Sequence, residues 1–253
     1  DPSSFYADAD SDGYGDPDNI TEACDQPSGT VTDDSDCDDS DKSINPDAED
    51  GKDGVDQDCD GKDGFAFTED FDAYTAGDYI ADNSIFFETW TTGGEGGSED
   101  VPVSDELSYS GDHSLRFDDS EGDDLVMILG PAAGTWMAEW YIYVETGAYF
   151  NLQGVGTPWE DWQKEVHIDG DGVVYDDGSS TGTEIAVGEW VLVEYQVDID
   201  NYTQELYFDS TLVISDTFTG SQMGGIDFYP TTISEDQDSA VFFIDDVGLY
   251  QVK

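Results

Sequence analysis

The sequence predicts an all-β protein, an antiparallel β-sandwich over residues 65–253 preceded by a loop-rich, Asp-rich cassette over residues 1–64. Three observations predict it. Apolar and polar residues alternate in short runs after residue 65, no stretch has the spacing of an amphipathic helix, and the chemistry of the chain changes near Lys62–Phe67. Many short strands without helices are typical of a sandwich.

The alternation is clearest in two runs, Trp136–Val144 and Trp190–Ile199. In the second run, apolar side chains occupy every other position and polar side chains lie between them, as in a half-buried antiparallel strand. Gly- and Asp-rich turns separate the shorter candidate strands, which are Leu125–Leu129, Glu165–Asp169, Gln204–Phe208, Thr211–Ser215, Gly225–Tyr229, Val241–Ile244 and Gly248–Val252.

The first 64 residues differ in composition. They hold 22 of the 62 acidic side chains, only three aromatic residues (Phe5, Tyr6 and Tyr14), and no window with a strand or helix period. We therefore expect little regular secondary structure there.

The charge of the chain is extreme, with 62 acidic and 6 basic side chains and a formal net charge of −56. Two carboxylates about 4 Å apart repel by roughly 4 kcal/mol at an effective dielectric constant near 20. Since six cations cannot neutralise 62 acids, metal ions or salt must supply the counter-charge. Nucleic acid and anionic membrane surfaces are excluded as partners because both require a basic face, and no apolar run approaches the ~20 residues that span a bilayer.

Three copies of Asp-x-Asp-x-Asp occur in the cassette, and Gly13 and Gly61 stand at the sixth position of two of them. Alternate carboxylates on a tight loop can converge on one Ca²⁺, which takes 6–8 oxygen ligands, and glycine permits the sharp turn. The alternative is a solvated acidic linker, because this composition produces about two such triplets by chance. The loops are not EF-hands, since no helices flank them and their twelfth positions hold Asn19, Asn45 and Phe67. Mg²⁺ is disfavoured because it prefers fewer protein ligands.

Three segments of the cassette resemble the MopE-like metal-binding motif of secreted bacterial proteins, which is similar in style to thrombospondin type-3 calcium repeats. They are Phe5–Asp16, Asp36–Asp39 with Ile44-Asn45-Pro46, and Asp53–Gly61. The resemblance implies several Ca²⁺ ions wrapped by the chain and stapled by disulfides. The ligands we expect are Asp8, Asp10, Asp12, Tyr14, Asp16, Asn19, Asp34, Asp36, Asp38, Asp39, Asp41, Asn45, Asp56, Asp58 and Asp60.

The three cysteines, Cys24, Cys37 and Cys59, all lie in the cassette, and an odd number leaves one unpaired or bonded to another chain. The MopE-like pattern implies a Cys24–Cys37 disulfide. The sequence departs from that pattern at Lys52, where a cysteine partner for Cys59 is usual, so the resemblance leaves Cys59 as a free thiol or an intermolecular link.

Short segments across residues 67–252 resemble concanavalin A-like (laminin G-like) jelly rolls. They are Phe67–Gly77, Tyr109–Leu115, Gly188-Glu189-Trp190, Glu205-Leu206-Tyr207 and Phe243–Val247. Such domains often carry a structural Ca²⁺ where the first and last strands meet. The resemblance thus makes Glu69, Asp70 and Asp246 candidate ligands, and an exposed acidic edge is the alternative.

We expect no catalytic residues. Related sandwiches that hydrolyse glycans carry Glu-x-Asp-x-x-Glu on one strand, so that two carboxylates share a face, and no string here fits that spacing. The two histidines, His113 and His167, have no partner serine or cysteine motif, so we expect ordinary roles for both.

Glycan binding requires exposed aromatic platforms, and Trp90, Trp159 and Trp162 could supply one; the alternative is that these tryptophans close the ends of the core. Two N-glycosylation sequons (Asn19-Ile20-Thr21 and Asn201-Tyr202-Thr203) and one bacterial O-glycosylation-like string (Asp238-Ser239-Ala240) are weak signals of modification.

These features favour a secreted or cell-surface protein. The start at Asp1 rather than Met fits a processed, exported chain, and equally a boundary without biological meaning. Our leading hypothesis is a non-enzymatic, calcium-stabilised subunit of a surface fibre or matrix, which binds copies of itself through Cys59 and an apolar-tipped arm, Ser3–Tyr6. The alternative is a carbohydrate-binding, lectin-like adhesin with a polysaccharide partner, and a degenerate glycan hydrolase is a weaker third.

Overall fold

The computed structural model describes residues 2–48, 57, 59, 62–90, 99–118, 122–155, 161–231 and 240–252, and for residues 62–66 it describes the backbone alone. The chain divides into two compact units. The first comprises Asp1–Ala66 with Tyr250–Lys253, and the second comprises Phe67–Leu249.

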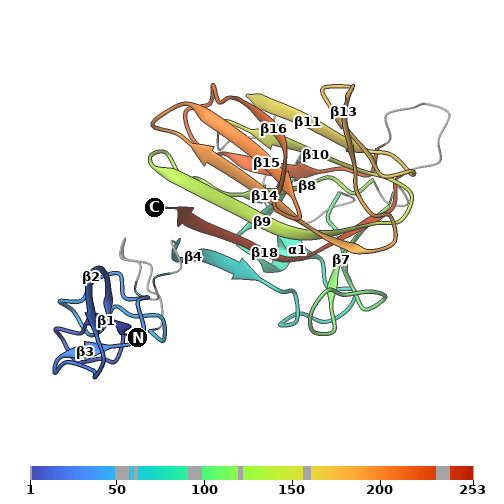
Figure 1. The fold of residues 1–253 in the computed structure, drawn as a ribbon. Coiled ribbons are helices and arrows are strands. Elements are labelled where there is room, and N and C mark those ends of the chain that lie inside the picture. Colours follow the sequence, from blue (N-terminus) through green and yellow to red (C-terminus); the bar gives the residue numbers. More distant parts are fainter. Residues whose placement is uncertain are drawn as a thin grey trace. The chain divides into compact units, whose positions relative to one another are not determined.

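The first unit contains a small antiparallel sheet (Figure 1), which the sequence did not predict. Its strands are β1 (Ser3–Ala7), β2 (Asp16–Ala23) and β3 (Thr30–Val31), in the order β2-β1-β3. The expectation of an arm over Ser3–Tyr6 is therefore wrong, because these residues lie in β1, which pairs with β2 along its length and with β3 at Tyr6 and Ala7, and Phe5 is buried. Cross-strand hydrogen bonds hold this sheet together, so it forms without the apolar periodicity that sequence analysis requires.

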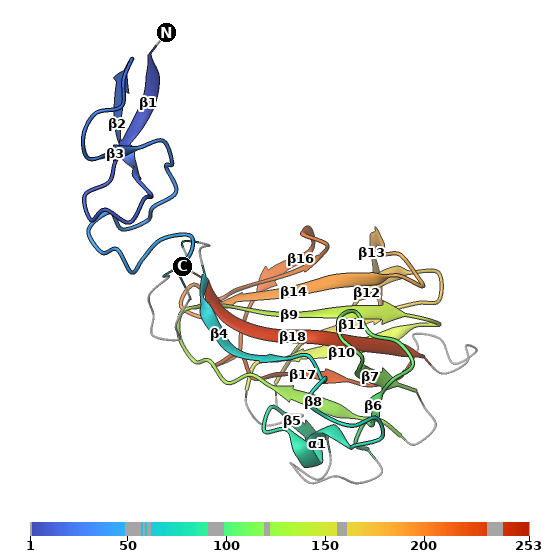
Figure 2. The ribbon, with the colours of Figure 1, turned by 90° about the horizontal axis from the view of Figure 1, so that it is seen from below.

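The second unit confirms the predicted antiparallel β-sandwich. One sheet has the strand order β13-β12-β11-β10-β17-β8-β5 in the described part of the chain. Figure 2 shows β10, β17 and β8 of this sheet lying below β9 and β18 of the other. Its strands are β5 (Phe87–Thr89), β8 (Leu125–Ile128), β10 (Ala148–Gln153), β11 (Trp162–Ile168), β12 (Val173–Asp176), β13 (Ser179–Glu184) and β17 (Gly225–Phe228).

The facing sheet has the order β16-β15-β14-β9-β18-β7-β6, and β4 also pairs with β18. Every pairing with a described register is antiparallel, and the only helix in the described residues is the single turn α1 (Ile80–Asn83). The strands of this sheet are β4 (Lys62–Glu69), β6 (Val103–Ser104), β7 (Ser114–Phe117), β9 (Thr135–Val144), β14 (Trp190–Asp198), β15 (Thr203–Phe208), β16 (Thr211–Thr217) and β18 (Phe242–Val252).

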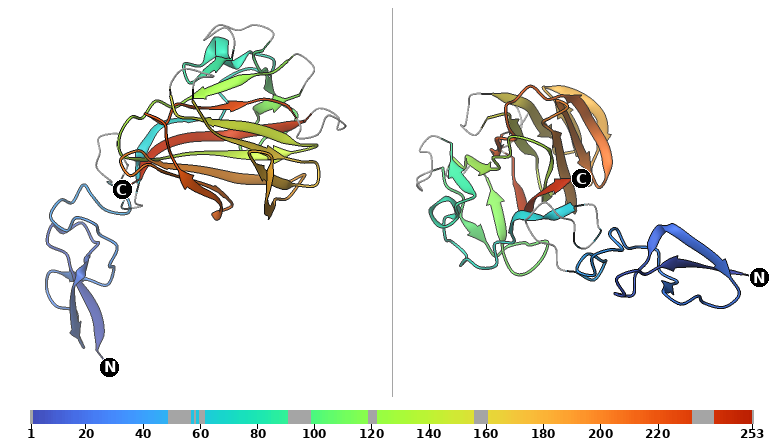
Figure 3. Two further views of the ribbon diagram at one scale, coloured as in Figure 1. Left: turned by 90° about the horizontal axis from the view of Figure 1, so that it is seen from above. Right: turned by 90° about the vertical axis from the view of Figure 1, so that its left-hand side faces the viewer.

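The core lies between the two sheets, whose layers are seen from two further directions in Figure 3. Trp140 of β9 is fully buried, and its ring meets Phe150 of β10 edge-on at 5.2 Å and Phe228 of β17 edge-on at 5.6 Å. Aromatic pairs of this kind add about 0.5–1.5 kcal/mol beyond the burial of their area. The alternation predicted for Trp136–Val144 and Trp190–Ile199 is confirmed, since alternate residues of β9 and β14 are buried.

The strand predictions missed β5, β6, β7, β12 and β13, which have six residues or fewer, and they were wrong in two further respects. The runs Val241–Ile244 and Gly248–Val252 form one strand, β18, because the acidic pair Asp245-Asp246 between them stays in the sheet. In addition, β10 was missed because all six of its residues are buried, so it lacks the in–out alternation of a half-exposed strand. The missed strand β10 carries part of a polar cluster, which lies on the sheet face that points away from the core.

Candidate functional site

Acidic side chains converge in the first unit, where the loop between β1 and β2 carries Asp8, Asp10 and Asp12. Two groups of three carboxylates form there in the described residues. In each group, one oxygen from each residue lies within 4.8 Å of the others. The groups are Asp8/Asp10/Asp39 and Asp10/Asp12/Asp36.

Short turns position the loop carboxylates. Asp8 Oδ1 accepts the N–H of Ser11 (2.8 Å), Asp10 Oδ1 accepts that of Asp12 (3.2 Å), and Asp12 Oδ1 accepts that of Tyr14 (2.9 Å). Aspartate favours such turns because its side chain bonds its own backbone two or three residues on. Each turn satisfies one oxygen of a carboxylate and leaves the other free to face inward.

A second acidic segment docks against this loop and completes both groups. The Asp36 N–H donates to the Gly15 carbonyl (3.2 Å), and the Ala9 N–H donates to Asp39 Oδ1 (2.7 Å). The contact is close at Gly15, where an added Cβ would lie 2.8 Å from the Asp33 carbonyl oxygen and equally near two side chains. Only glycine fits this position without displacing its neighbours.

Among the described residues, three buried oxygens of the second group have no hydrogen-bond partner: Asp10 Oδ2, Asp12 Oδ2 and Asp36 Oδ2. Asp36 is only 3% exposed. Burial, together with the charges of neighbouring aspartates, raises the pKa of Asp36 and of Asp10. Buried carboxylate oxygens without partners are costly, and a hard cation ligated by oxygen would satisfy all three. The residues present therefore fit a Ca²⁺ ion.

The other predicted ligands are distributed differently from the expectation. Within the described residues, Asp36 is the one member of the triplet Asp34/Asp36/Asp38 that joins a group, and Asp34 and Asp38 are exposed. Asn19 lies in strand β2 with an exposed side chain, so it does not continue the loop as a twelfth-position ligand. Neither carboxylate group includes Asp16 or Asp41, the groups do not test Tyr14 and Asn45, which carry no carboxylate, and Asp56, Asp58 and Asp60 lie outside the described residues.

The predicted Cys24–Cys37 disulfide is wrong. Cys37 is bonded to Cys59 instead, with Cα atoms 5.7 Å apart, and Cys24 is the free, exposed thiol. The Asn45 N–H donates to the Gln57 carbonyl (2.8 Å), which holds the segment near Cys59 against the one that follows Cys37. Cys24 directly follows the end of β2.

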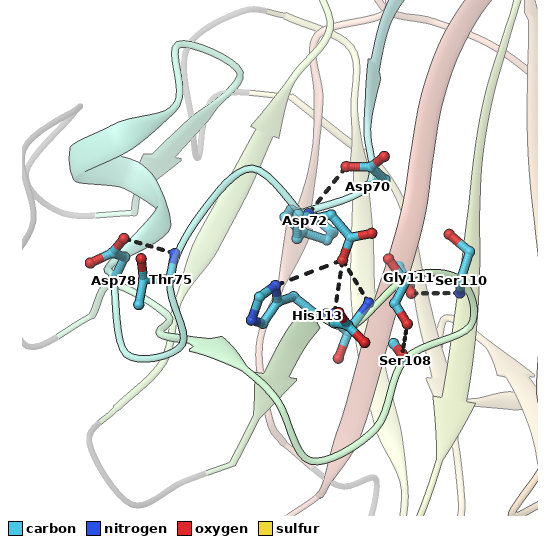
Figure 4. A network of polar contacts seen from close by, with 12 residues as sticks. Asp70, Asp72, Thr75, Asp78, Ser108, Ser110, Gly111 and His113 are labelled. Carbon is cyan, nitrogen blue, oxygen red and sulfur yellow. Dashed lines mark hydrogen bonds and ion pairs between the residues drawn. The ribbon is translucent and has the colours of Figure 1, made fainter.

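A second acidic cluster lies on the sandwich, in the loops that follow β4 and precede β7 (Figure 4). Glu69, Asp70 and Asp246 do not form a three-carboxylate group. Glu69 accepts the Phe71 N–H (3.0 Å) and the Tyr74 hydroxyl (2.7 Å), and Asp70 accepts the Asp72 N–H (3.1 Å). Asp246 Oδ1 accepts the Ser110 hydroxyl (2.9 Å). Protein donors thus engage each of these three carboxylates.

Asp72, which was not predicted, is central to this cluster. Its Oδ1 accepts the N–H groups of Asp112 (2.7 Å) and His113 (3.0 Å) and lies 3.7 Å from His113 Nδ1. Asp245 is fully buried and accepts the N–H groups of Tyr109 and Ser110, and burial raises its pKa to about 6. The cluster therefore ties two loops to β18.

A different polar cluster lies on the face of the first sandwich sheet that points away from the core. Glu165 of β11, Asn151 of β10 and Asp227 of β17 are direct cross-strand partners, so their side chains share that face. Tyr149 and Gln153 flank Asn151 on β10. We call the following residues the outer polar cluster: Tyr149, Asn151, Gln153, Glu165, His167 and Asp227.

Hydrogen bonds connect this cluster. Asn151 Nδ2 donates to Asp227 Oδ2 (2.5 Å), Gln153 Nε2 donates to Asn151 Oδ1 (3.0 Å), and the Tyr149 hydroxyl donates to Glu165 Oε1 (3.1 Å). Asn151, Gln153 and Asp227 are at most 4% exposed. A sheet face with a purely structural role rarely buries several polar side chains side by side.

Asp124, just before β8, joins the cluster through Asp227. Burial raises the pKa of Asp124 to about 6, and it raises the pKa of Asp227 well above the ordinary value because the neighbouring Asp124 carboxyl adds to the effect. Two carboxyls this close share a proton rather than both ionising. Burial also lowers the pKa of His167.

Trp90 and Trp162, two of the tryptophans proposed from the sequence as a glycan platform, lie beside this cluster and outside the core. Their ring centroids are 6.1 Å apart, and Trp162 is 48% exposed. Trp90 follows β5, and its N–H donates to the Asp124 carbonyl (3.0 Å). A β-bulge in the pairing of β10 with β11 makes Trp162 the partner of Gln153, which puts both on the same face. Trp159 lies outside the described residues.

A groove of about 500 Å³ lies elsewhere, beside β6 and β7. None of the predicted site residues lines it. Its one cation, Arg116, is paired with Glu106 (3.3 Å) and with Asp118. This groove therefore presents neither a free cation nor a converging set of ligands.

No protein-family model matches the sequence, and no curated protein matches it. Solved structures of similar fold include an endo-acting O-glycanase expressed by members of the human gut microbiota, with 14% identity, a TM-score of 0.48, and coverage of 75% of this chain and 100% of that one. The match to a sialidase has 13% identity and a TM-score of 0.44, and it covers 69% of this chain. The match to an alginate lyase of polysaccharide lyase family 7 has 10% identity and a TM-score of 0.44, and it covers 60% of this chain and 82% of the lyase chain. The chain spans 18% of the length of the sialidase. At these identities the likeness concerns the fold alone.

Within the described residues, no helix has the length and apolar character needed to cross a membrane. The Cys37–Cys59 disulfide is typical of proteins that fold in an oxidising compartment.

Proposed function

We propose that the chain is a non-enzymatic extracellular protein whose first unit is a calcium-binding module. One observation carries the proposal: three buried carboxylate oxygens, from Asp10, Asp12 and Asp36, have no hydrogen-bond partner and belong to side chains that converge. Ions bound there would offset part of the net charge of −56 and hold the two acidic segments together.

Calcium suits this donor set better than other metals. The convergent atoms are carboxylate oxygens, which hard cations prefer over the softer transition metals. Two groups share Asp10, so the module has room for more than one ion. Mg²⁺ demands a near-ideal octahedron and retains waters, whereas Ca²⁺ tolerates the irregular, crowded oxygen sets that short Asp turns produce.

Calorimetric titration with CaCl₂ and with MgCl₂ tests the proposal. We expect Ca²⁺ uptake by the wild type, and at least tenfold weaker affinity after Asp36→Asn. Asp34→Asn is the matched control, because Asp34 lies two residues away, is exposed and belongs to neither group. No Ca²⁺ uptake by the wild type, or equal losses in both variants, would contradict it.

A second candidate function, carbohydrate binding by the sandwich, is favoured by the Trp90–Trp162 pair. Two neighbouring indole rings, one of them half exposed, provide an apolar platform beside buried hydrogen-bonding groups. Sites for small polar ligands combine these two features. A polysaccharide is the partner that this surface fits.

Assembly into a fibre remains a rival hypothesis with copies of this chain as the partner. The features first assigned to it differ in the structure, since Ser3–Tyr6 lies in strand β1 rather than in a free arm and Cys59 is bonded to Cys37. Light scattering in millimolar Ca²⁺, with and without chelator, tests it for the wild type and Cys24→Ser. Growth of large particles in Ca²⁺ supports assembly, and a constant monomer mass contradicts it.

A further inference from the structure

Resting on the carbohydrate-binding role proposed above, we infer that the outer polar cluster, together with the Trp90–Trp162 pair, is a binding site for neutral sugar units. The tryptophans would stack against the apolar faces of sugar rings. The cluster would exchange hydrogen bonds with the sugar hydroxyl groups.

The first argument is the register of the sheet. Glu165, Asn151 and Asp227 come from three adjacent strands and are direct partners, so they form one row across the sheet. Tyr149 and His167 are the partners of the next row, with ring centroids 4.6 Å apart. Two rows of polar side chains on paired strands make a rigid surface of fixed spacing, which suits recognition of a ligand with several hydroxyl groups.

The second argument is the set of atoms that remain unsatisfied. Within the described residues, His167 Nδ1 is buried and has no hydrogen-bond partner, and the buried Oδ1 atoms of Asp124 and Asp227 have only the proton that these two carboxyls share. Asp227 itself is only 4% exposed. An unsatisfied buried atom costs about 1–3 kcal/mol, so His167 Nδ1 requires a partner from outside these residues, and the carboxyl pair keeps lone pairs that a further donor can occupy. Sugar hydroxyls can act as donors and as acceptors, and bound waters would hold the same places before a sugar displaces them.

The third argument is the bulge that turns Trp162 toward this face. In the regular register, Trp162 would lie on the same side as Lys164, whose side chain is buried between Asp176 and Asp216. The bulge instead makes Trp162 the partner of Gln153 and brings its ring to Trp90. A half-exposed indole contributes no core packing, so its placement beside the cluster is explained by contact with a ligand.

The charge of the protein selects the class of sugar. The chain carries 62 acidic groups against 6 basic ones, and Glu165 lies in the cluster itself. An anionic sugar such as a uronate or sialic acid would be repelled by the protein as a whole, with no cation in the cluster to hold its carboxylate. Neutral hexoses and N-acetylhexosamines carry no such penalty.

A glycan array with neutral and anionic oligosaccharides, probed with the Ca²⁺-loaded full chain, followed by calorimetry on the best soluble hit, tests the inference. We expect binding to neutral glycans. We expect at least tenfold weaker affinity for Trp162→Ala, for His167→Ala and for Asp227→Asn. Tyr202→Ala, which removes a 61% exposed aromatic side chain at the turn between β14 and β15, should bind like the wild type.

The outcomes separate the site from the function. If the wild type binds no glycan, the carbohydrate-binding role itself fails. If it binds, but Trp162→Ala and His167→Ala retain full affinity, the role stands and the site assigned here is wrong. Preference for anionic glycans would overturn the ligand class. Near-UV circular dichroism identifies a variant that has lost its fold, and Trp162→Ala, at an exposed position, carries the test if Asp227→Asn unfolds.

Discussion

The backbone N–H of Asp36 donates to the carbonyl of Gly15 at 3.2 Å, and this bond joins two acidic segments that are separate in the sequence. It places the Asp36 carboxylate among those of Asp10 and Asp12. Mutual repulsion of these three close carboxylates, of which that of Asp36 is buried, opposes this arrangement. A bound cation removes that repulsion, so metal binding and the fold of the first unit should be coupled.

Gly15→Ala should weaken calcium binding by at least tenfold. The new Cβ would lie 2.8 Å from three atoms of neighbouring residues, which would push the two acidic segments apart. Thr32→Ala is the control, because Thr32 lies in the same unit, is exposed and has no positive backbone φ. Calorimetric Ca²⁺ titration of both variants measures the difference. Equal affinities for Gly15→Ala and the wild type would show that the close contact does not position the ligands.

Removing the Cys37–Cys59 disulfide should destabilise the first unit. The bond closes a loop between residues 22 apart in the sequence, for which chain-entropy models give about 3 kcal/mol. We expect Cys59→Ser to be cleaved within residues 1–64 by a protease that spares the Ca²⁺-loaded wild type, and Cys24→Ser to behave like the wild type. Thiol titration of the unfolded, unreduced wild type should find one thiol per chain. If Cys59→Ser instead has no free thiol and still resists the protease, Cys37 pairs with Cys24 and not with Cys59.

Lys164→Met should destabilise the sandwich by about 1–3 kcal/mol, less than breaking a fully buried ion pair costs, because the carboxylates left behind are 26% exposed at Asp176 and 51% exposed at Asp216. The Lys164 ammonium is 2.9 Å from Asp216 and 3.2 Å from Asp176, and it links strands of the two sheets. Its side chain is only 9% exposed. Urea unfolding followed by tryptophan fluorescence measures the change, with the exposed Lys42→Met as control. A loss below 1 kcal/mol would mean that the buried charge is not needed.

The free energy of unfolding of the sandwich should fall as pH rises from about 4 to 7. Burial raises the folded-state pKa of Asp124 from 3.8 to about 6, so the folded protein holds more protons than the unfolded chain across this interval. The stability that the protonated Asp124 carboxyl contributes is therefore fully present at low pH, and it is lost as pH rises through the folded-state pKa. The full shift corresponds to roughly 3 kcal/mol, and we expect about 1–2 kcal/mol because Asp124 keeps some contact with solvent.

Asp124→Asn isolates this effect, since asparagine stays neutral at every pH. In saturating Ca²⁺, the stability difference between wild type and variant should change by about 1–2 kcal/mol between pH 4 and 7, whereas exposed Asp200→Asn should show no such change. A pH-independent difference would exclude a proton shared between Asp124 and Asp227.

The sequence predicted much of the sandwich and less of the sites. The alternation along β9 and β14 identified the half-buried strands, because period two is a local property of the chain. The strand β10 was not predicted because it is buried on both faces. The contact between Asn151 of this strand and Asp227 was therefore not predicted either. These two residues are 76 positions apart, and only the pairing of β10 with β17 brings them together.

The acidic cassette shows the same limit. The sequence predicted Asp36 and Asp39 as ligands as well as Asp8, Asp10 and Asp12, but not that the first two would join the loop carboxylates, because contacts between segments bring them there. The disulfide likewise depends on the approach of the segment near Gln57 to Asn45, which no local pattern signals. Local periodicity thus predicts elements, and sites built from distant segments require the fold.

The most direct test of the central claim is an anomalous difference map from crystals grown in millimolar CaCl₂. We predict a calcium peak bounded by Asp10, Asp12 and Asp36, with oxygens of all three at about 2.3–2.6 Å from the ion. A map with no peak there, and ordered water bonded to the three carboxylates instead, would contradict it.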